Sequence, residues 1–393
     1  METEKRTVYM DHSATTPMRC EVVDAMLPYF QEKFGNASSV HSFGREAHEA
    51  IEQSREKLAA LIGARPDEVI FTGGGTESDN LAVVGAARAY EKKGRHLITS
   101  AVEHQAVLNT CGQLEKEGFE VTRLPVDADG LVDPEELRRS LRPDTSLVSV
   151  MLANNEVGVI EPVAELARIA REAGALFHTD AVQAMGKIPV DVEDLGVDLL
   201  TMSGHKFHGP KGVGALYRRK GTRLLPIMRG GHHERSMRPG TENVPGIVGL
   251  AAALEFAAAE QPGEHERLRG LRDRLQAGII ERIPDVQVNG HSDRRLPHLL
   301  NVSVLGIEGE SMLLTLDVHG IAVSTGSACT SGTLEPSHVL TAMGIPAEIA
   351  HGSLRFSLGR MNTTEDVDYV LEVLPNVVAR LRDMSPIYRK SHP

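Results

Sequence analysis

The chain has 393 residues, of which 41% are hydrophobic and 24% charged, and its formal net charge at pH 7 is −12. This length predicts two domains, or one large α/β domain with an appendage, and the negative charge disfavours non-specific binding to nucleic acid or anionic membranes. The sequence has no apolar run as long as a membrane span, no signal-peptide pattern and only three cysteines, which argues against a disulfide framework. We therefore expect a cytoplasmic protein that acts neither on a membrane nor directly on nucleic acid.

Short apolar segments alternate with helical patterns along the first part of the chain. Helices are predicted at 76–93 and 163–173, and another passes through Leu108 and Leu114. Strands are predicted at 68–71, 96–100, 121–125, 147–152, 175–181, 198–202 and 213–217. Strands that alternate with helices predict a mostly parallel sheet covered on both faces.

The pattern changes at residues 261–263, where Gln-Pro-Gly separates a predicted alanine-rich helix from a charged one. Beyond this point the predicted strands are sparser, at 286–288, 300–304, 321–325 and 354–358, and a final amphipathic helix covers 364–382. Proline and glycine at such a change are typical of a domain boundary. We expect a large domain at 16–261 and a small domain made of 1–15 and 262–393.

A glycine-rich turn at 72–75 lies between a predicted strand and a predicted helix. Glycines let the backbone approach an anion, the amides at the start of the helix bind phosphate, and Thr76 adds a hydroxyl. The same residues also fit a plain turn capped by Thr76.

Other polar residues follow strands further along the chain. His104 comes after the strand at 96–100, where an imidazole can stack on a cofactor ring and move protons, and Asn154 and Asn155 follow the strand at 147–152. Each of these features alone also fits an ordinary surface residue or turn.

Asp180 and Lys206 form the most informative pair in the sequence. Asp180 ends the predicted strand at 175–181, and Lys206 follows the strand at 198–202 after Ser203-Gly204-His205. Ligands of open α/β sheets bind outside the carboxyl ends of the strands. A lysine that forms a Schiff base and a carboxylate that pairs with a pyridinium nitrogen are what pyridoxal phosphate (PLP) needs.

Cys329 lies in a run of small and polar residues at about 324–334, which predicts a mobile, exposed loop. A thiol there is either incidental or a nucleophile carried by the loop. Cys20 and Cys111 lie in helix-like contexts and fit core or surface positions.

Arg355 lies inside the apolar strand at 354–358, which is costly unless the charge is paired. A guanidinium there suits a substrate carboxylate or a structural ion pair. The adjacent residues His232, His233 and Glu234 do not converge easily on one ion, so no metal site is expected.

Together these segments resemble the cysteine desulfurases of the NifS/IscS-like class, which are PLP enzymes of fold type I within the class-V aminotransferases. The resemblance runs over nearly the whole chain. It is carried by the segments 9–17, 34–41, 76–77, 103–104, 154–156, 178–183, 203–206, 238–243, 326–329 and 334–340.

The resemblance implies a large domain with a mostly parallel seven-stranded sheet and a smaller α+β domain. It implies that Lys206 holds PLP as a Schiff base and moves the substrate Cα proton, that Asp180 pairs with the pyridine nitrogen and that His104 stacks on the ring. The phenolic oxygen of the ring would be bonded by Asn155 and Gln183. The phosphate would be held by Gly75, Thr76, Ser203, His205 and Thr241, the last from the other subunit of a homodimer.

The resemblance also implies that L-cysteine is the substrate and that Arg355, helped by Asn36 and Asn155, binds its carboxylate. Cys329 would accept the sulfur as a persulfide, leave L-alanine, and serve at most as a transient iron–sulfur ligand. The acceptor of the sulfur would be an iron–sulfur scaffold protein or another protein such as a thiolation relay.

The chain departs from the family pattern at His12, where asparagine is usual, at Ala37, where proline is usual, and in the glycine turn at 73–75. None of these changes removes a catalytic group, although His12 alters the polarity near the substrate. The short C-terminal tail is more similar to the NifS branch than to the IscS branch. A selenocysteine lyase and a sulfur donor dedicated to thiolation remain alternatives. An aminotransferase or another PLP lyase would give Cys329 no task, and a non-catalytic scaffold would not need the reactive groups.

Overall fold

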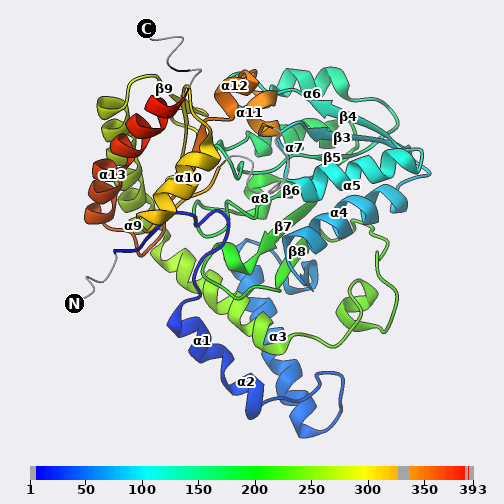
Figure 1. The fold of residues 1–393 in the computed structure, drawn as a ribbon. Coiled ribbons are helices and arrows are strands. Elements are labelled where there is room, and N and C mark those ends of the chain that lie inside the picture. The colour runs from blue at the N-terminus through cyan, green and yellow to red at the C-terminus, as the bar shows by residue number, and fades with distance from the viewer. Residues whose placement is uncertain (1–5, 326–335, 386–387, 389–393) are drawn as a thin grey trace.

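The structure is a computed structural model that describes residues 6–325, 336–385 and 388. Its largest sheet has seven strands: β2 (Val69–Thr72), β3 (His96–Ser100), β4 (Glu120–Leu124), β5 (Thr145–Ser149), β6 (Leu176–Asp180), β7 (Leu199–Ser203) and β8 (Gly214–Arg218). They lie in the order β2-β8-β7-β6-β5-β3-β4, of which the strands from β8 to β4 are labelled in Figure 1. Strand β8 runs antiparallel to β2 and β7, and all the other neighbouring pairs are parallel. The predicted mostly parallel, seven-stranded sheet is confirmed.

Side chains from the strands of this sheet alternate between two hydrophobic cores. One core contains Ile70, Leu97, Leu147 and Leu216, which pack with α4 (Gly75–Ala89) and α5 (Gln105–Lys116). The other core contains their neighbours Phe71, Ile98, Val148 and Tyr217, which pack with α3 (Ser42–Leu61), α7 (Val163–Glu172) and the first part of α9 (Val244–Arg282). Burial of both faces explains why these strands are continuous apolar runs in the sequence.

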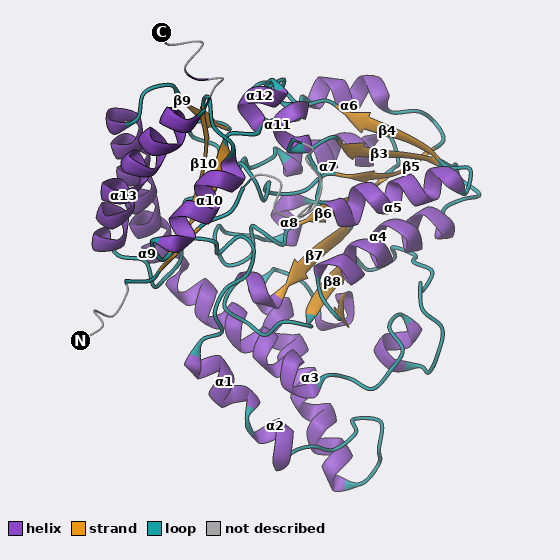
Figure 2. Ribbon diagram, viewed as in Figure 1, coloured by secondary structure: helices purple, strands orange, loops and turns teal. Residues whose placement is uncertain are grey.

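A second unit is built on a three-stranded antiparallel sheet in the order β12-β10-β9. Its strands are β9 (Val286–Asn289), β10 (Leu299–Val304) and β12 (Ser353–Ser357). Helices α10 (Gly309–Val318) and α13 (Thr364–Met384) and the second part of α9 share its core. The N-terminal strand β1 (Val8–Tyr9) joins this unit by pairing in parallel with β11 (Ile321–Ala322). Figure 2 shows the two units side by side, with α9 running from one to the other.

Helix α9 is one continuous element where the sequence predicted two. Pro262 lies inside it at an exposed position, and the helix continues to Arg282. Its residues belong to the large-sheet core up to Leu254 and to the small-sheet core from Leu268 onwards. Packing on both sides compensates for the hydrogen bond that a proline removes from the helix. The predicted domain boundary at 261 remains a prediction, and within α9 the buried residues of the two cores lie on either side of it.

The remaining helices are short. They are α1 (Cys20–Met26), α2 (Pro28–Gln31), α6 (Pro134–Ser140), α8 (Val192–Leu195), α11 (His338–Ala342) and α12 (Ala347–Ala350). No helix within the described ranges combines the length and the apolar character needed to cross a membrane.

The topology places the polar residues of interest at one edge of the large sheet. Strands β3, β5, β6 and β7 are parallel, so their carboxyl ends meet there, and β2, which is antiparallel to β8, points the same way. The glycine turn after β2, His104 after β3 and Asn155 after β5 therefore approach Asp180 and Lys206 at the ends of β6 and β7.

Candidate active site

Lys206 ends a short 3₁₀ turn (Gly204–Lys206) that follows β7 directly. Its Nζ donates hydrogen bonds to the carbonyl oxygens of Ser13 at 2.5 Å and Ala14 at 2.8 Å. Gln183 donates from Nε2 to the same Ser13 oxygen at 3.0 Å. The N-terminal segment therefore closes one side of the site and brings Gln183 beside the lysine.

Asp180 and His104 lie close enough to Lys206 for their charges to interact. Asp180 is 5% exposed, and its Oδ1 accepts a hydrogen bond from the Val182 N–H at 2.8 Å. Burial raises the pKa of the Asp180 carboxyl, while His104 and Lys206 oppose that shift. Burial lowers the pKa of His104, Asp180 opposes the shift and Lys206 adds to it. The three residues that the sequence placed at separate strand ends form one electrostatic cluster.

His104 is also the N-cap of α5. Its Nδ1 accepts a hydrogen bond from the Ala106 N–H at 3.1 Å. A neutral imidazole that accepts at Nδ1 carries its proton on Nε2. The cap therefore sets both the orientation and the tautomer of the ring.

A cleft of about 730 Å³ opens between the glycine turn and the end of β7. Its lining includes Gly73, Gly74, Gly75, Thr76, Ser203, His205 and Lys211. A Cβ on Gly75 would lie 2.9 Å from Val182 Cγ2, and Gly74 adopts φ +146°, so both positions suit glycine. The cleft lies at the N-terminus of α4, where backbone amides favour an anion. These features fit the phosphate of a cofactor.

Lys211 is a cleft residue that the sequence analysis missed. It lines the cleft together with the glycine turn, five residues beyond Lys206 in the Gly-Pro-Lys-Gly part of the same segment. The local signal was a lysine between a proline and a glycine, but the direction of its side chain depends on the turn that follows Lys206.

The two asparagines after β5 have different roles. Asn154 stabilises the turn, because its Oδ1 accepts from the N–H groups of Glu156 and Val157 and its Nδ2 donates to the Val102 carbonyl. Asn155 lies beside Arg355, whose Nη1 donates to the Asn155 carbonyl at 2.9 Å. The turn interpretation of the pair therefore holds for Asn154.

Arg355 is buried on β12, and only some of its guanidinium N–H groups have hydrogen-bond partners. Its Nη2 forms an ion pair with Asp11 Oδ1 at 2.9 Å, and its Nε is buried without a hydrogen-bond partner. A buried N–H without a partner is costly, so a ligand that accepts from it is favoured. The sequence offered a structural ion pair and a carboxylate site as alternatives for Arg355. The two are compatible, because they use different N–H groups of the guanidinium.

Asn36 and Thr241 lie apart from this cluster within one chain. Asn36 lies in the connection between α2 and α3, where its Oδ1 accepts from the Ser38 N–H at 2.9 Å. Thr241 is exposed just before α9. The described contacts join neither residue to Lys206 or Arg355, so their predicted roles stay predictions.

Cys329 lies outside the described residues, but both flanks of its segment are described. On one side, Ser324 exchanges two backbone hydrogen bonds with Arg355, at 3.2 and 2.7 Å. On the other side, Ser337 donates to Glu156 Oε2 at 2.5 Å, and His338 Nε2 lies 2.9 Å from the carbonyl oxygen of Glu103. The described residues on the two sides of the Cys329 segment therefore contact Arg355 and Glu103, and Glu103 directly precedes His104.

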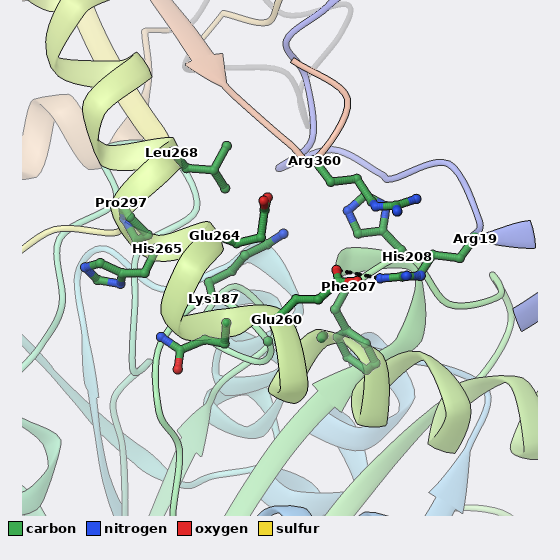
Figure 3. Close-up of a pocket in the computed structure, with 13 residues that line it drawn as sticks. Arg19, Lys187, Phe207, His208, Glu260, Glu264, His265, Leu268, Pro297 and Arg360 are labelled. Carbon is green, nitrogen blue, oxygen red and sulfur yellow. Dashed lines mark hydrogen bonds and ion pairs between the residues drawn. The ribbon is translucent and has the colours of Figure 1, made fainter. Parts of the chain in front are cut away.

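A second, smaller cavity lies near Lys187, between α9 and the segment that follows Lys206 (Figure 3). Its volume is about 30 Å³, enough for roughly one water molecule. Burial lowers the pKa of the Lys187 amine to about 8. Arg19 and Glu260, at the edge of the cavity, form a hydrogen-bonded ion pair. The size of this cavity excludes it as a cofactor or substrate site.

Glu103 gives a prediction about stability. Its Oε1 accepts from Ser100 Oγ at 2.7 Å and the Met151 N–H at 2.8 Å, while Oε2 is buried without a partner. Burial raises the pKa of this carboxyl from 4.5 to about 8. The folded state therefore holds a proton that the unfolded chain releases first, and stability is lost as the pH rises from 4.5 to about 8.

We expect Glu103→Gln to remove this pH dependence. Each pKa unit corresponds to about 1.4 kcal/mol. The free energy of unfolding of the variant should therefore rise by several kcal/mol relative to that of the parent across that window, in addition to any difference that is the same at every pH. Urea denaturation over the window measures this, with the exposed Glu115→Gln as control. A difference between parent and variant that does not change with pH would contradict the prediction.

Comparisons with known proteins agree with this geometry. The family pattern "Aminotransferase class-V" matches residues 8–370. A protein of Dictyoglomus turgidum named "Cysteine desulfurase IscS" is 57% identical over 382 residues, which covers 97% of each chain. A solved structure named "NIFS-LIKE PROTEIN" has a TM-score of 0.91 and 42% identity, and covers 96% of this chain and 100% of its own. Another, named "SspA in complex with cysteine", has a TM-score of 0.79 and 38% identity, and covers 90% and 99%. This chain is therefore a member of the class-V aminotransferase family.

Proposed function

We propose that the chain is a cysteine desulfurase that takes sulfur from L-cysteine and leaves L-alanine and a persulfide on Cys329. The observation that carries the proposal is the convergence of Lys206, Asp180 and His104 at one sheet edge. One flank of the Cys329 segment is bonded to Arg355, and the other is bonded to Glu103, the neighbour of His104. The name of the relative from D. turgidum and the similar solved structure of SspA in complex with cysteine support this activity and this substrate.

The class-V family depends on PLP, and the residues here fit that cofactor. The glycine turn with Thr76, Ser203 and His205 would hold its phosphate, Asp180 would pair with its ring nitrogen and Lys206 would hold it covalently. When bound, PLP supplies an electron sink for the charge that remains after loss of the substrate Cα proton. Asn155 and Gln183 are the proposed partners of the ring oxygen. Of these, Gln183 Nε2 already lies within hydrogen-bond distance of the Ser13 carbonyl that Lys206 also contacts.

The remaining steps belong to the side chains of this chain. Arg355 would bind the substrate carboxylate through its unoccupied Nε–H, and Lys206 would move the Cα proton. The Cys329 thiolate would then form a bond to the substrate sulfur while the bond from that sulfur to Cβ breaks. The electron pair goes to Cβ, which takes a proton to become the methyl group of L-alanine.

A second copy of the chain would complete the site. Leu27, Phe30, Phe34, Val40 and Phe43 are between 50 and 89% exposed, and the Phe34 and Phe43 rings lie 5.6 Å apart. Exposed apolar patches of this kind mark association surfaces. Asn36 belongs to the same segment, so association through this patch would carry it toward a neighbouring site. We propose a cytoplasmic homodimer that passes its persulfide sulfur to an iron–sulfur scaffold or a thiolation protein.

The test is the yield of sulfide and L-alanine from L-cysteine by the PLP-loaded protein in the presence of a thiol reductant. We expect equal amounts of both products and their loss in Lys206→Ala and Cys329→Ala. Cys20→Ala, which removes an exposed cysteine at the start of α1, is the matched control and should keep full activity. Full activity in Cys329→Ala would overturn the persulfide mechanism and favour a lyase of the selenocysteine type.

A further inference from the structure

Glu77 connects the glycine turn to the segment 237–243. It lies in the first turn of α4 and lines the cofactor cleft. Its Oε2 accepts a hydrogen bond from the Gly73 N–H at 2.9 Å, and its Oε1 accepts one from Arg238 Nε at 3.0 Å. One carboxylate thus holds the backbone of the glycine turn and a side chain from a segment 161 positions away.

A carboxylate is an unexpected group in a cleft for a phosphate, because like charges repel. Arg238 offsets the charge of Glu77. The Glu77 side chain is 23% exposed and the Arg238 side chain is 27% exposed. The lack of a side chain at residue 73 makes room for this pair, since a Cβ there would lie 2.6 Å from Glu77 Oε2. The carboxylate therefore has a task other than attracting the ligand.

The segment that carries Arg238 is anchored a second time, at Glu234. Glu234, Arg235 and Ser236 have φ values of 46°, 57° and 64°, which are unfavourable for residues other than glycine. The buried Glu234 carboxylate pairs with Arg55 at 2.7 and 2.8 Å and accepts from the Phe71 N–H at 2.8 Å. Phe71 belongs to β2, the strand that leads into the glycine turn.

We propose that Glu77 is a positioning residue that sets the glycine turn for the cofactor phosphate and the segment 237–243 for presentation of Thr241. The proposal rests on the proposed function for the roles of the phosphate and of a second subunit. Because one carboxylate bonds to both parts, a change in either part alters the other. Cofactor affinity and subunit association are therefore linked, and the link acts equally in both directions.

The direction in which one substitution changes the PLP affinity tests this role. In Glu77→Gln one of the two carboxylate oxygens becomes an NH2 donor, so the Gly73 N–H and Arg238 Nε can no longer each keep the separate oxygen that accepts from it. We expect PLP to bind about 5- to 10-fold more weakly, the effect of losing one hydrogen bond of this kind. If Glu77 acted only through its charge, its removal would relieve repulsion of the phosphate and PLP would bind more tightly. The measurement is bound cofactor, from its absorbance, after dialysis of the holoenzyme against a series of PLP concentrations.

A double-mutant cycle with Arg238→Met separates positioning from simple damage to the fold. The double variant should bind PLP no more weakly than Glu77→Gln alone, because both changes break the same connection. Gly73→Ala should reproduce the loss by displacing the carboxylate. The control is Glu117→Gln, which breaks a comparable ion pair on the surface. Glu117 Oε2 lies 3.0 Å from Arg88 Nη2, and neither residue lines the cleft, so the PLP affinity should stay unchanged.

Sedimentation equilibrium of the same holoenzymes tests the link to subunit association. We expect Glu77→Gln to weaken dimerisation as well as PLP binding. Unchanged or tighter PLP binding, or additive losses in the cycle, would overturn the proposal, and an unchanged dimer would overturn the link. These measurements contain no L-cysteine, so a failure of the desulfurase assay would not mimic either result.

Discussion

Asp180→Asn should lower kcat for L-cysteine by about two to three orders of magnitude. Asparagine keeps the shape of the side chain but loses the negative charge, so it cannot stabilise a protonated ring nitrogen. Asp180 is 5% exposed, so water cannot replace that charge. Steady-state kinetics measure the loss, and the absorbance of the bound cofactor checks that the variant still binds PLP.

Asp79→Asn is the matched control for this prediction. Asp79 is 1% exposed and interacts electrostatically with Asp180, and its Oδ1 lies 3.7 Å from His178 Nε2. Burial, with Asp180 adding to the effect, raises the pKa of Asp79 well above its ordinary value, which favours the uncharged form of the carboxyl that asparagine resembles. We expect this variant to stay within a few-fold of the parent. Equal losses in both variants would show that buried polarity, and not the charge of Asp180, is what the site requires.

Arg355→Gln should lower kcat/KM for L-cysteine by about 30- to 1,000-fold, which corresponds to roughly 2–4 kcal/mol for a buried charged partner. Most of the loss should appear in KM, because the substrate carboxylate is bound both before and during the reaction. The structure supports this through the buried Nε–H, which has no partner although Nη1 and Nη2 are both engaged. Kinetics over a range of L-cysteine concentrations separate the two parameters.

Asp11→Asn distinguishes a binding arginine from a structural one. The amide oxygen still accepts from Arg355 Nη2, so the guanidinium stays in place with weaker support. We expect a rise in KM of less than about 10-fold, consistent with the loss of charge from one hydrogen bond. If Arg355 served only the ion pair, both variants would lower the free energy of unfolding and leave KM unchanged. Thermal unfolding measured beside the kinetics tells these outcomes apart.

The similar proteins carry the names of both branches that the sequence suggested. The curated relative carries the name IscS, whereas a solved structure with the same fold is named NifS-like. The assignment to the NifS branch, which depended on a short tail, stays a prediction. The physiological acceptor of the sulfur is likewise open to a direct test by transfer from the persulfide form.

The sequence by itself determined the large sheet and the approximate location of its reactive groups. Continuous apolar strands predicted burial on both faces, and parallel strands place their carboxyl ends at one edge. Lys206, Asp180 and His104 therefore had to approach one another once the strand order was right. Such short-range patterns are readable because each strand and each turn is encoded by neighbouring residues.

Only the tertiary structure decided which distant residues contact one another. Arg355 pairs with Asp11 across 344 positions, and Arg238 reaches Glu77 across 161. The continuity of α9 through Pro262 likewise depends on cores that pack against its two halves. These contacts have no local signal, because the side chains that form them are brought together by tertiary packing and not by the spacing of residues along the chain.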